Sequence, residues 1–128
     1  MMKNNEIRKW WEQAIEDIDT ADINLKAGKY YASVLFCQQA VEKSLKALWI
    51  KIENREIPFI HDLTFFSKKL NAPKEFFDIC KKLTISYTQT RYPDMDDIIP
   101  SKKFSKNVAE EYLKKSKSFI EWIKSRIT

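Results

Sequence analysis

The residues best suited to chemistry lie in one proline-bounded segment, Arg91–Pro100, with the sequence Arg-Tyr-Pro-Asp-Met-Asp-Asp-Ile-Ile-Pro. An arginine can hold a phosphate with its planar fork of N–H donors, and the ring of Tyr92 offers a surface on which a nucleobase can stack. An arginine at a helix end can equally pair with a carboxylate such as Asp94, so both interpretations of Arg91 stay open. We take Arg91, Tyr92 and Asp94 as candidate ligand-binding residues.

The chain has a single histidine, His61, beside Asp62 at an expected helix start. In the structural interpretation the ring packs and hydrogen-bonds at this junction while Asp62 caps the helix. In the functional interpretation His61 is a ligand contact or a general base, which requires its ring to fold back next to Arg91. We add His61 to the candidate ligand-binding residues and assign no catalytic residue.

The acidic run of Asp94, Asp96 and Asp97 has the ligand type of a metal site but not its spacing. A calcium loop needs a glycine and a distal glutamate in fixed register. One histidine cannot build a di-metal helix bundle or a histidine zinc cluster, and two isolated cysteines cannot complete a cysteine-rich zinc site. A single glycine also excludes a glycine-rich phosphate loop. We therefore expect no metal and no cofactor.

Length and composition predict one globular domain over residues 1–128. The chain is 44% hydrophobic and 32% charged, which excludes low-complexity, collagen-like and disordered classes. No apolar run approaches a membrane span and no signal-peptide pattern is present, so we expect a cytoplasmic protein with no membrane contact. Cys37 and Cys80 have apolar neighbours and should be buried, reduced thiols. The net charge of +5 allows either a phosphate-bearing partner or a solvated basic helix face.

Apolar residues at spacings of three and four predict helices, and no segment has the pattern of a strand. The expected helices run from Asn4 or Asn5 to the glycine at 28, from about Lys29 to Asn54, from Asp62 to Asn71, from Pro73 to Arg91, and from between Ser105 and Asn107 onwards. Gly28 should adopt a positive φ and reverse the chain. Short links and one longer loop then predict an all-α, five-helix antiparallel up-and-down bundle.

The second of these helices has a wide apolar face, which suits the centre of a bundle or a helix that also packs on a second copy. Gln38 interrupts this face, so its amide is either hydrogen-bonded in the core or held at an interface. Further apolar positions expected to face the core include Ile52, Val108 and, on the fourth helix, Phe76, Phe77, Cys80, Leu83, Ile85 and Tyr87.

Several short segments, taken together and in order, resemble one known family. They are Trp10-Trp11-Glu12-Gln13-Ala14 with Asp17 and Ala21, the run from Tyr30 to Ala47, His61-Asp62-Leu63, Tyr87 with Arg91-Tyr92-Pro93-Asp94, and Phe119-Ile120-Glu121-Trp122-Ile123. On these residues the chain resembles HEPN domain proteins (higher eukaryotes and prokaryotes nucleotide-binding) along almost its whole length. The resemblance implies a helical bundle that usually forms a homodimer. It also implies a stand-alone prokaryotic protein that is the partner of a minimal nucleotidyltransferase in a toxin-antitoxin-like pair.

Many HEPN proteins are metal-independent ribonucleases whose signature is an arginine followed, four to six residues later, by a histidine. Arg91 is present here, but Asp96, Asp97 and Ile98 stand where that histidine would be. An exposed aspartate is ionised near neutral pH and is a poor general acid. We therefore expect a non-catalytic module that binds a nucleotide or an RNA phosphate near Arg91. The alternative is a divergent ribonuclease in which Arg91 stabilises charge and His61 or an aspartate carries the proton.

Overall fold

The computed structural model describes residues 2–128, which contain six α-helices, one 3-10 helix and no strand. The elements are α1 (Met2–Lys26), α2 (Tyr30–Glu53), α3 (Leu63–Lys69), the 3-10 helix η1 (Lys74–Phe76), α4 (Phe77–Gln89), α5 (Pro100–Lys103) and α6 (Lys106–Ile127). The all-α class is confirmed. The expected count of five helices is not, because α5 adds a short helix after the irregular segment.

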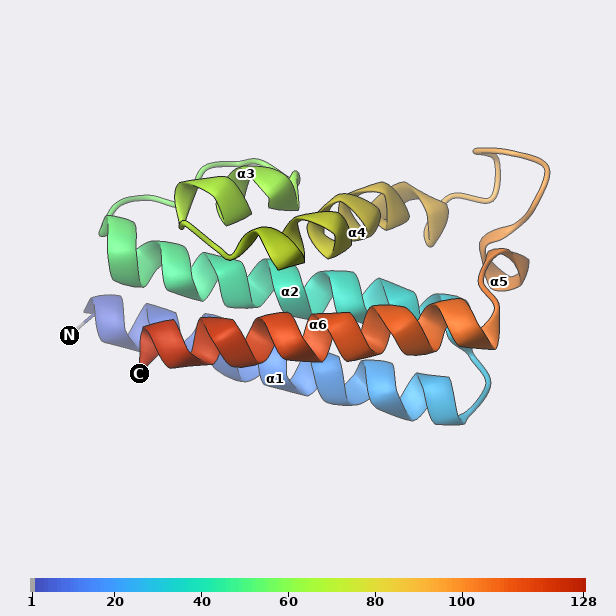
Figure 1. The fold of residues 1–128 in the computed structure, drawn as a ribbon, viewed down its shortest axis with the longest axis horizontal. Coiled ribbons are helices and arrows are strands. Elements are labelled where there is room, and N and C mark those ends of the chain that lie inside the picture. The colour runs from blue at the N-terminus through green and yellow to red at the C-terminus, as the bar shows by residue number, and fades with distance from the viewer. Residues whose placement is uncertain (1) are drawn as a thin grey trace.

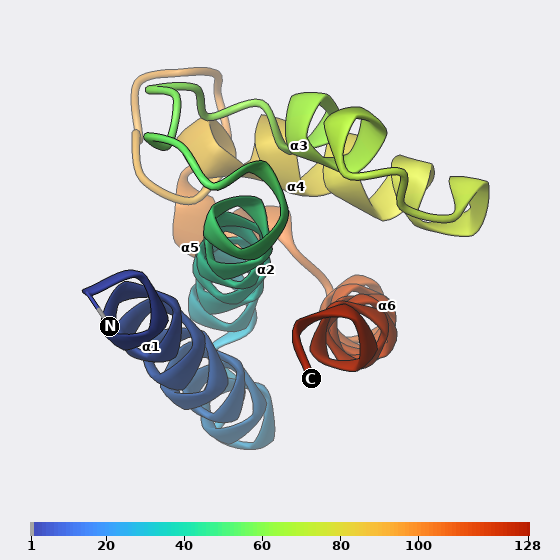
Figure 2. The same ribbon diagram turned by 90° about the vertical axis from the view of Figure 1, so that its left-hand side faces the viewer.

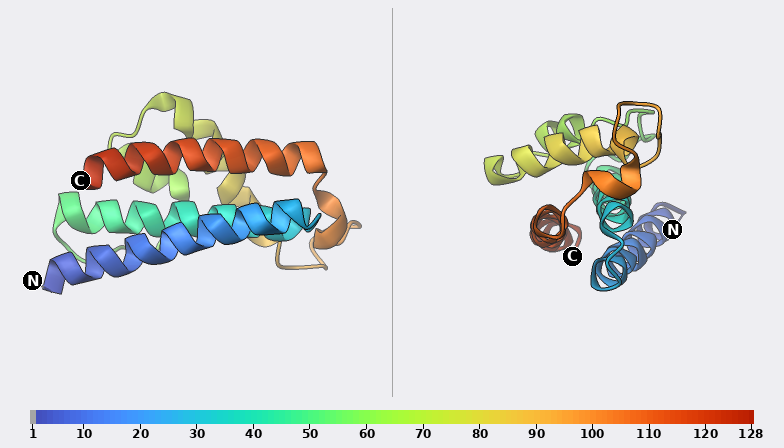
Figure 3. Two further views of the ribbon diagram at one scale, coloured as in Figure 1. Left: turned by 90° about the horizontal axis from the view of Figure 1, so that it is seen from below. Right: turned by 90° about the vertical axis from the view of Figure 1, so that its right-hand side faces the viewer.

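α2 is the central helix of the bundle (Figure 1). Figure 2, which looks along the long axis, shows α1 and α6 on one side of α2 and the α3–α4 pair on the other. The four long helices alternate in direction, so both chain ends lie at one end of the molecule, whereas residues 91–99 and α5 lie at the opposite end. From below, α6 runs beside α2 while α1 crosses it at a shallow angle (Figure 3). In residues 2–128 no helix is long and apolar enough to span a membrane.

Gly28 ends α1 and turns the chain into α2, as expected. Its φ is +79°, a conformation that residues with a Cβ rarely adopt. The N–H groups of Gly28 and Lys29 return to the carbonyls of Leu25 and Asn24 at 3.0 and 2.8 Å, respectively. No atom lies within 4 Å of the position a Cβ would take, so the backbone conformation, and not lack of space, favours glycine here.

Two helix caps form, of which the one at Asp62 was expected. Asp62 accepts from the backbone N–H of Thr64 at 2.9 Å, and Ser105 accepts from that of Val108 at 3.2 Å. The expected cap at Asn4 or Asn5 is wrong, because α1 already begins at Met2 and Asn5 instead accepts from Arg8 Nη2 at 2.7 Å. No glycine or proline precedes Asn5 to stop the helix from extending.

The core lies around α2 and contains Trp49, Phe66 and Phe119 as its largest fully buried side chains. Cys37 and Cys80 are free and buried, as expected, and burial raises the pKa of each thiol to about 12. Such thiols stay protonated and are unreactive near neutral pH.

Four apolar residues that were expected in the core are exposed. Phe77 and Ile85 on α4 are 37% and 51% exposed, and Ile52 and Val108 are 42% and 41% exposed. On α4 the buried residues are Ile79, Cys80, Leu83 and Ser86. Phe77 and Ile85 are eight positions apart and therefore lie on the same side of this helix. Each is two positions from a buried residue, Ile79 or Leu83, and residues two positions apart point to nearly opposite sides of a helix. The spacing pattern therefore assigned too wide a face of α4 to the core.

Candidate functional site

α2 carries three polar side chains, Gln38, Glu42 and Lys46, within its otherwise buried surface. Their spacing of four residues places them on one side of the helix. Gln38 is fully buried, and its amide donates to Glu42 Oε1 at 3.4 Å. Glu42 Oε2 lies 3.7 Å from Lys46 Nζ. Gln38 is thus hydrogen-bonded in the interior, the first of its two expected alternatives. Burying amides and charges is costly without partners, and the side chains of this polar stripe supply partners to one another.

Arg91 reaches the polar stripe from the chain that follows α4. Its Nη2 donates to Gln38 Oε1 at 3.4 Å, and its Nη1 donates to the backbone carbonyl of Tyr87 at 2.8 Å. Its guanidinium carbon lies 3.9 Å from the centre of the Tyr87 ring. Within residues 2–128 Arg91 forms no ion pair, and the pairing with Asp94 that remained open from the sequence is absent.

His61, in the segment before α3, also contacts the polar stripe. Its Nδ1 lies 3.3 Å from Glu42 Oε1, and its ring centre lies 5.1 Å from that of Tyr87. An ionised carboxylate only accepts hydrogen bonds, so Nδ1–H donates to Glu42 and Nε2 remains free on a half-exposed side chain. Tyr87 therefore contacts both the His61 ring and the Arg91 guanidinium.

A second group of side chains extends the cluster toward α1. Gln39 Nε2 donates to Gln38 Oε1 at 2.8 Å, and Lys43 Nζ donates to Gln39 Oε1 at 2.9 Å. Lys43 Nζ also donates to Asp17 Oδ2 at 2.6 Å, and the Asp17 side chain is only 6% exposed. A continuous chain of hydrogen bonds thus links Arg91 to the contact between α1 and α2. Such a network holds its members in fixed positions.

Sequence reasoning did not single out Glu42, Lys43 or Lys46 as site residues. The available signal was the four-residue spacing of Gln38, Glu42 and Lys46 within an apolar helix, which places polar groups where the core is expected. Only the fold supplies the partners of these residues, because His61 and Arg91 arrive from other elements.

Tyr92 and Asp94 are not part of this cluster. The Tyr92 side chain is 44% exposed, and Asp94 is also exposed. The segment that contains them is held to α5 through Asp96. The Asp96 carboxylate lies 3.0 Å from Lys103 Nζ on α5 and accepts a hydrogen bond from the backbone N–H of Ile98 at 2.8 Å. The neighbouring Lys103 ammonium lowers the pKa of Asp96 below its usual value. In the part of the chain that the structure describes, no group of three or more acidic, histidine or cysteine side chains could hold a metal ion.

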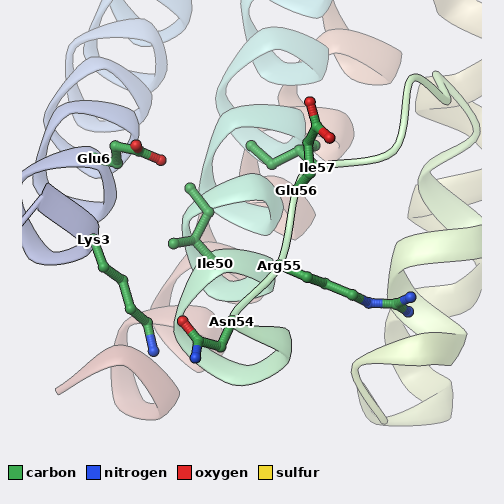
Figure 4. Close-up of a pocket in the computed structure, with 7 residues that line it drawn as sticks. All are labelled: Lys3, Glu6, Ile50, Asn54, Arg55, Glu56 and Ile57. Atoms are coloured by element: carbon green, nitrogen blue, oxygen red, sulfur yellow. The ribbon is translucent and has the colours of Figure 1, made fainter.

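The largest cavity described, about 520 Å³, lies at the other end of the bundle. It is lined by Lys3, Glu6, Ile50, Asn54, Arg55, Glu56 and Ile57, where the start of α1 faces the end of α2 (Figure 4). Figure 4 shows Arg55 directed away from Lys3 and Glu6. The lining of this cavity has two basic and two acidic side chains and no aromatic ring. It therefore lacks the excess positive charge and the stacking surface that favour a nucleotide. The cluster around Arg91 is the better candidate.

Comparisons with known proteins agree with this fold. The HEPN domain profile matches residues 7–126. The crystal structure of TT1696 from Thermus thermophilus matches with a TM-score of 0.86 at 25% identity, covering 95% of this chain and 98% of that one. ST0689, an archaeal HEPN homologue, matches with a TM-score of 0.80 at 24% identity, again covering 95% and 98%. None of the curated proteins matches the sequence. Because the profile covers nearly all of it, the chain belongs to the HEPN domain family.

Proposed function

We propose that this HEPN domain protein is a non-catalytic module that binds a nucleotide or nucleic-acid phosphate at Arg91. The main support for this proposal is the environment of the Arg91 guanidinium. This guanidinium is partly buried, lies on the Tyr87 ring and has no carboxylate partner in the part of the chain that the structure describes. A guanidinium with unused donors and little solvent around it is suited to a phosphate. The exposed Tyr92 ring, one residue further on, is available for a base to stack on.

Isothermal titration calorimetry with ATP, GTP and short RNA tests this site. Arg91→Ala should weaken binding at least about tenfold, because a charge-assisted hydrogen bond contributes about 1.5–3 kcal/mol. The matched control is Arg126→Ala, which removes the same charge from an exposed position on α6. Equal binding by the wild type and Arg91→Ala would remove the proposed site.

We also propose that the protein forms a homodimer through its long helices and joins a minimal nucleotidyltransferase subunit in a toxin-antitoxin-like pair. Membership of the HEPN family supports this assignment. Exposed Ile15 and Ile23 on one face of α1 supply apolar surface for a second copy. Light scattering at tens of micromolar, roughly the range in which weak dimers form, measures the mass, and a monomer would contradict the dimer. A gene for a minimal nucleotidyltransferase beside this one would support the pairing.

A second candidate function, a divergent ribonuclease, is favoured by the contact between His61 and Glu42. Glu42 holds Nδ1 and leaves Nε2 free to take or give a proton, while Arg91 on the same Tyr87 ring could stabilise charge on a phosphorane. Incubation of purified protein with RNA decides between the candidates. Cleavage that both Arg91→Ala and His61→Ala abolish would establish the enzyme, whereas cleavage that persists in both variants would indicate contamination.

A further inference from the structure

The outer surface between α3 and α4 holds two adjoining cavities of about 380 and 290 Å³ that share Phe77 as a wall. Lys68 and Lys74 line the first cavity, and Lys81 and Ile85 line the second. We call this surface the α3–α4 groove. Figure 2 shows that the α3–α4 layer lies across α2, and Arg91 lines neither cavity. The groove is therefore a separate feature from the proposed phosphate site.

The floor of the α3–α4 groove is apolar although it faces water. Phe77 and Ile85 are 37% and 51% exposed and lie on the same side of α4, away from α2. Eight residues of helix separate them by about 12 Å, or about two turns. Ala72 and Pro73 extend the apolar lining beyond Phe77. Exposed apolar residues that gather in a groove indicate a surface that a partner covers.

The rim of the α3–α4 groove carries a net positive charge, and its lysines are not paired with carboxylates in the described chain. Lys68, Lys74 and Lys81 form no ion pair within residues 2–128, and Lys68 Nζ instead lies 5.0 Å from the centre of the Phe77 ring. The one carboxylate in the lining, Asp62, caps α3 by accepting from the Thr64 backbone N–H and hydroxyl at 2.9 and 2.6 Å. Three lysines against one aspartate leave the lining with a net charge of +2 (3 − 1). Elsewhere on α4, by contrast, Lys82 is paired with a carboxylate at 3.1 Å.

We propose that the α3–α4 groove binds an acidic amphipathic helix of a protein partner. Apolar side chains of such a helix, spaced two turns apart, would cover Phe77 and Ile85, and its carboxylates would pair with the three lysines. A nucleic acid would satisfy the lysines and could stack on Phe77, but it offers far less aliphatic surface than leucine or isoleucine side chains with which to cover Ile85. The combination of an apolar floor and a basic rim therefore favours a protein partner over a nucleic acid.

Selection from a display library of random peptides about 16 residues long, panned against the full-length chain, tests the proposal while the partner is still unidentified. The enriched peptides should be acidic, with apolar residues at helical spacing. Synthetic copies should lose at least about tenfold in affinity, measured by fluorescence anisotropy, for Phe77→Ser and for Lys81→Glu. The matched control is Lys9→Glu, which makes the same charge change at an exposed position of α1. Circular dichroism verifies that each variant is folded, as expected for exposed positions.

Three results would overturn the proposal. The first is a selection that enriches no peptide, or enriches peptides without net negative charge. The second is equal binding of the selected peptides to wild type, Phe77→Ser and Lys81→Glu. The third is binding of a uridine oligonucleotide, but not of the peptides, that Lys81→Glu abolishes, since the groove would then be a nucleic-acid surface. None of these outcomes depends on Arg91, so failure here is distinguishable from failure of the phosphate site.

Discussion

Replacement of Glu42 by alanine removes the carboxylate that three side chains share beside α2. Gln38 and His61 lie 3.4 and 3.3 Å from its Oε1, and Lys46 lies 3.7 Å from its Oε2. The Glu42 side chain is 9% exposed, so water cannot easily replace it. We expect Glu42→Ala to destabilise the fold, because it leaves these three partners without the carboxylate.

The expected loss is about 1.5–2 kcal/mol of unfolding free energy. Leaving the buried Gln38 amide without an acceptor costs about 1 kcal/mol, the lower end of the usual range, because the hydrogen bond is long. Loss of the Lys46 ion pair adds about 0.5–1 kcal/mol, since the flexible lysine can still move its ammonium toward water. Glu42→Gln keeps the shape and one acceptor, so it should cost about half as much.

Urea unfolding followed by circular dichroism measures these differences. The control is Glu12→Ala, which removes an exposed carboxylate that is paired with Arg8 at 3.3 Å, and it should change stability by less than about 0.5 kcal/mol. If Glu42→Ala were as stable as Glu12→Ala, the polar stripe would not be the tightly coupled network inferred above, and Glu42 would not hold His61 in place.

Three other changes test individual features of the fold. Gly28→Ala should cost about 1 kcal/mol in urea unfolding, because φ is +79° at this position, and a smaller effect would refute the stated need for glycine. Asp96→Asn should lower the urea midpoint at neutral pH, because it removes the ion pair with Lys103. Lys103 lowers the pKa of Asp96 in the folded state, so the difference in midpoint from wild type should be present above pH 3.8. It should disappear as the pH falls through the lower, folded-state pKa. A constant difference down to low pH would contradict the ion pair. Cys37 and Cys80, whose pKa values are raised to about 12, should react with a thiol reagent far more slowly in the folded chain than in urea, and equal rates would contradict their burial.

The parts of the fold that depend on local sequence could be predicted from the chain alone. Gly28 and the cap at Asp62 act within a few residues of themselves, so their types and positions were enough to predict them. Phe77 and Ile85 could not be placed in this way. The apolar spacing on α4 is wide enough to suit two faces, and only the packing against α2 determines which one is buried.

The candidate site could be predicted only in part, for a similar reason. Arg91 and His61 stood out by residue type, but their partners lie far away in the sequence, and Arg91 and Gln38 are 53 positions apart. Contacts of this kind leave no local pattern in the chain. Tyr92 and Asp94 are predicted from their chemistry near Arg91, a ring for stacking and a carboxylate for pairing. Both lie in the exposed segment, however, and it is Tyr87, one helical turn before Arg91, that contacts its guanidinium.

Calorimetric titration of the wild type, Arg91→Ala and Arg126→Ala with the same short RNA and nucleotides is the sharpest test of a phosphate site at Arg91. We expect saturable binding by the wild type and by Arg126→Ala, with a loss of at least about tenfold for Arg91→Ala alone. Equal affinity in all three proteins, or equal weakening by both substitutions, would contradict a specific phosphate site at Arg91.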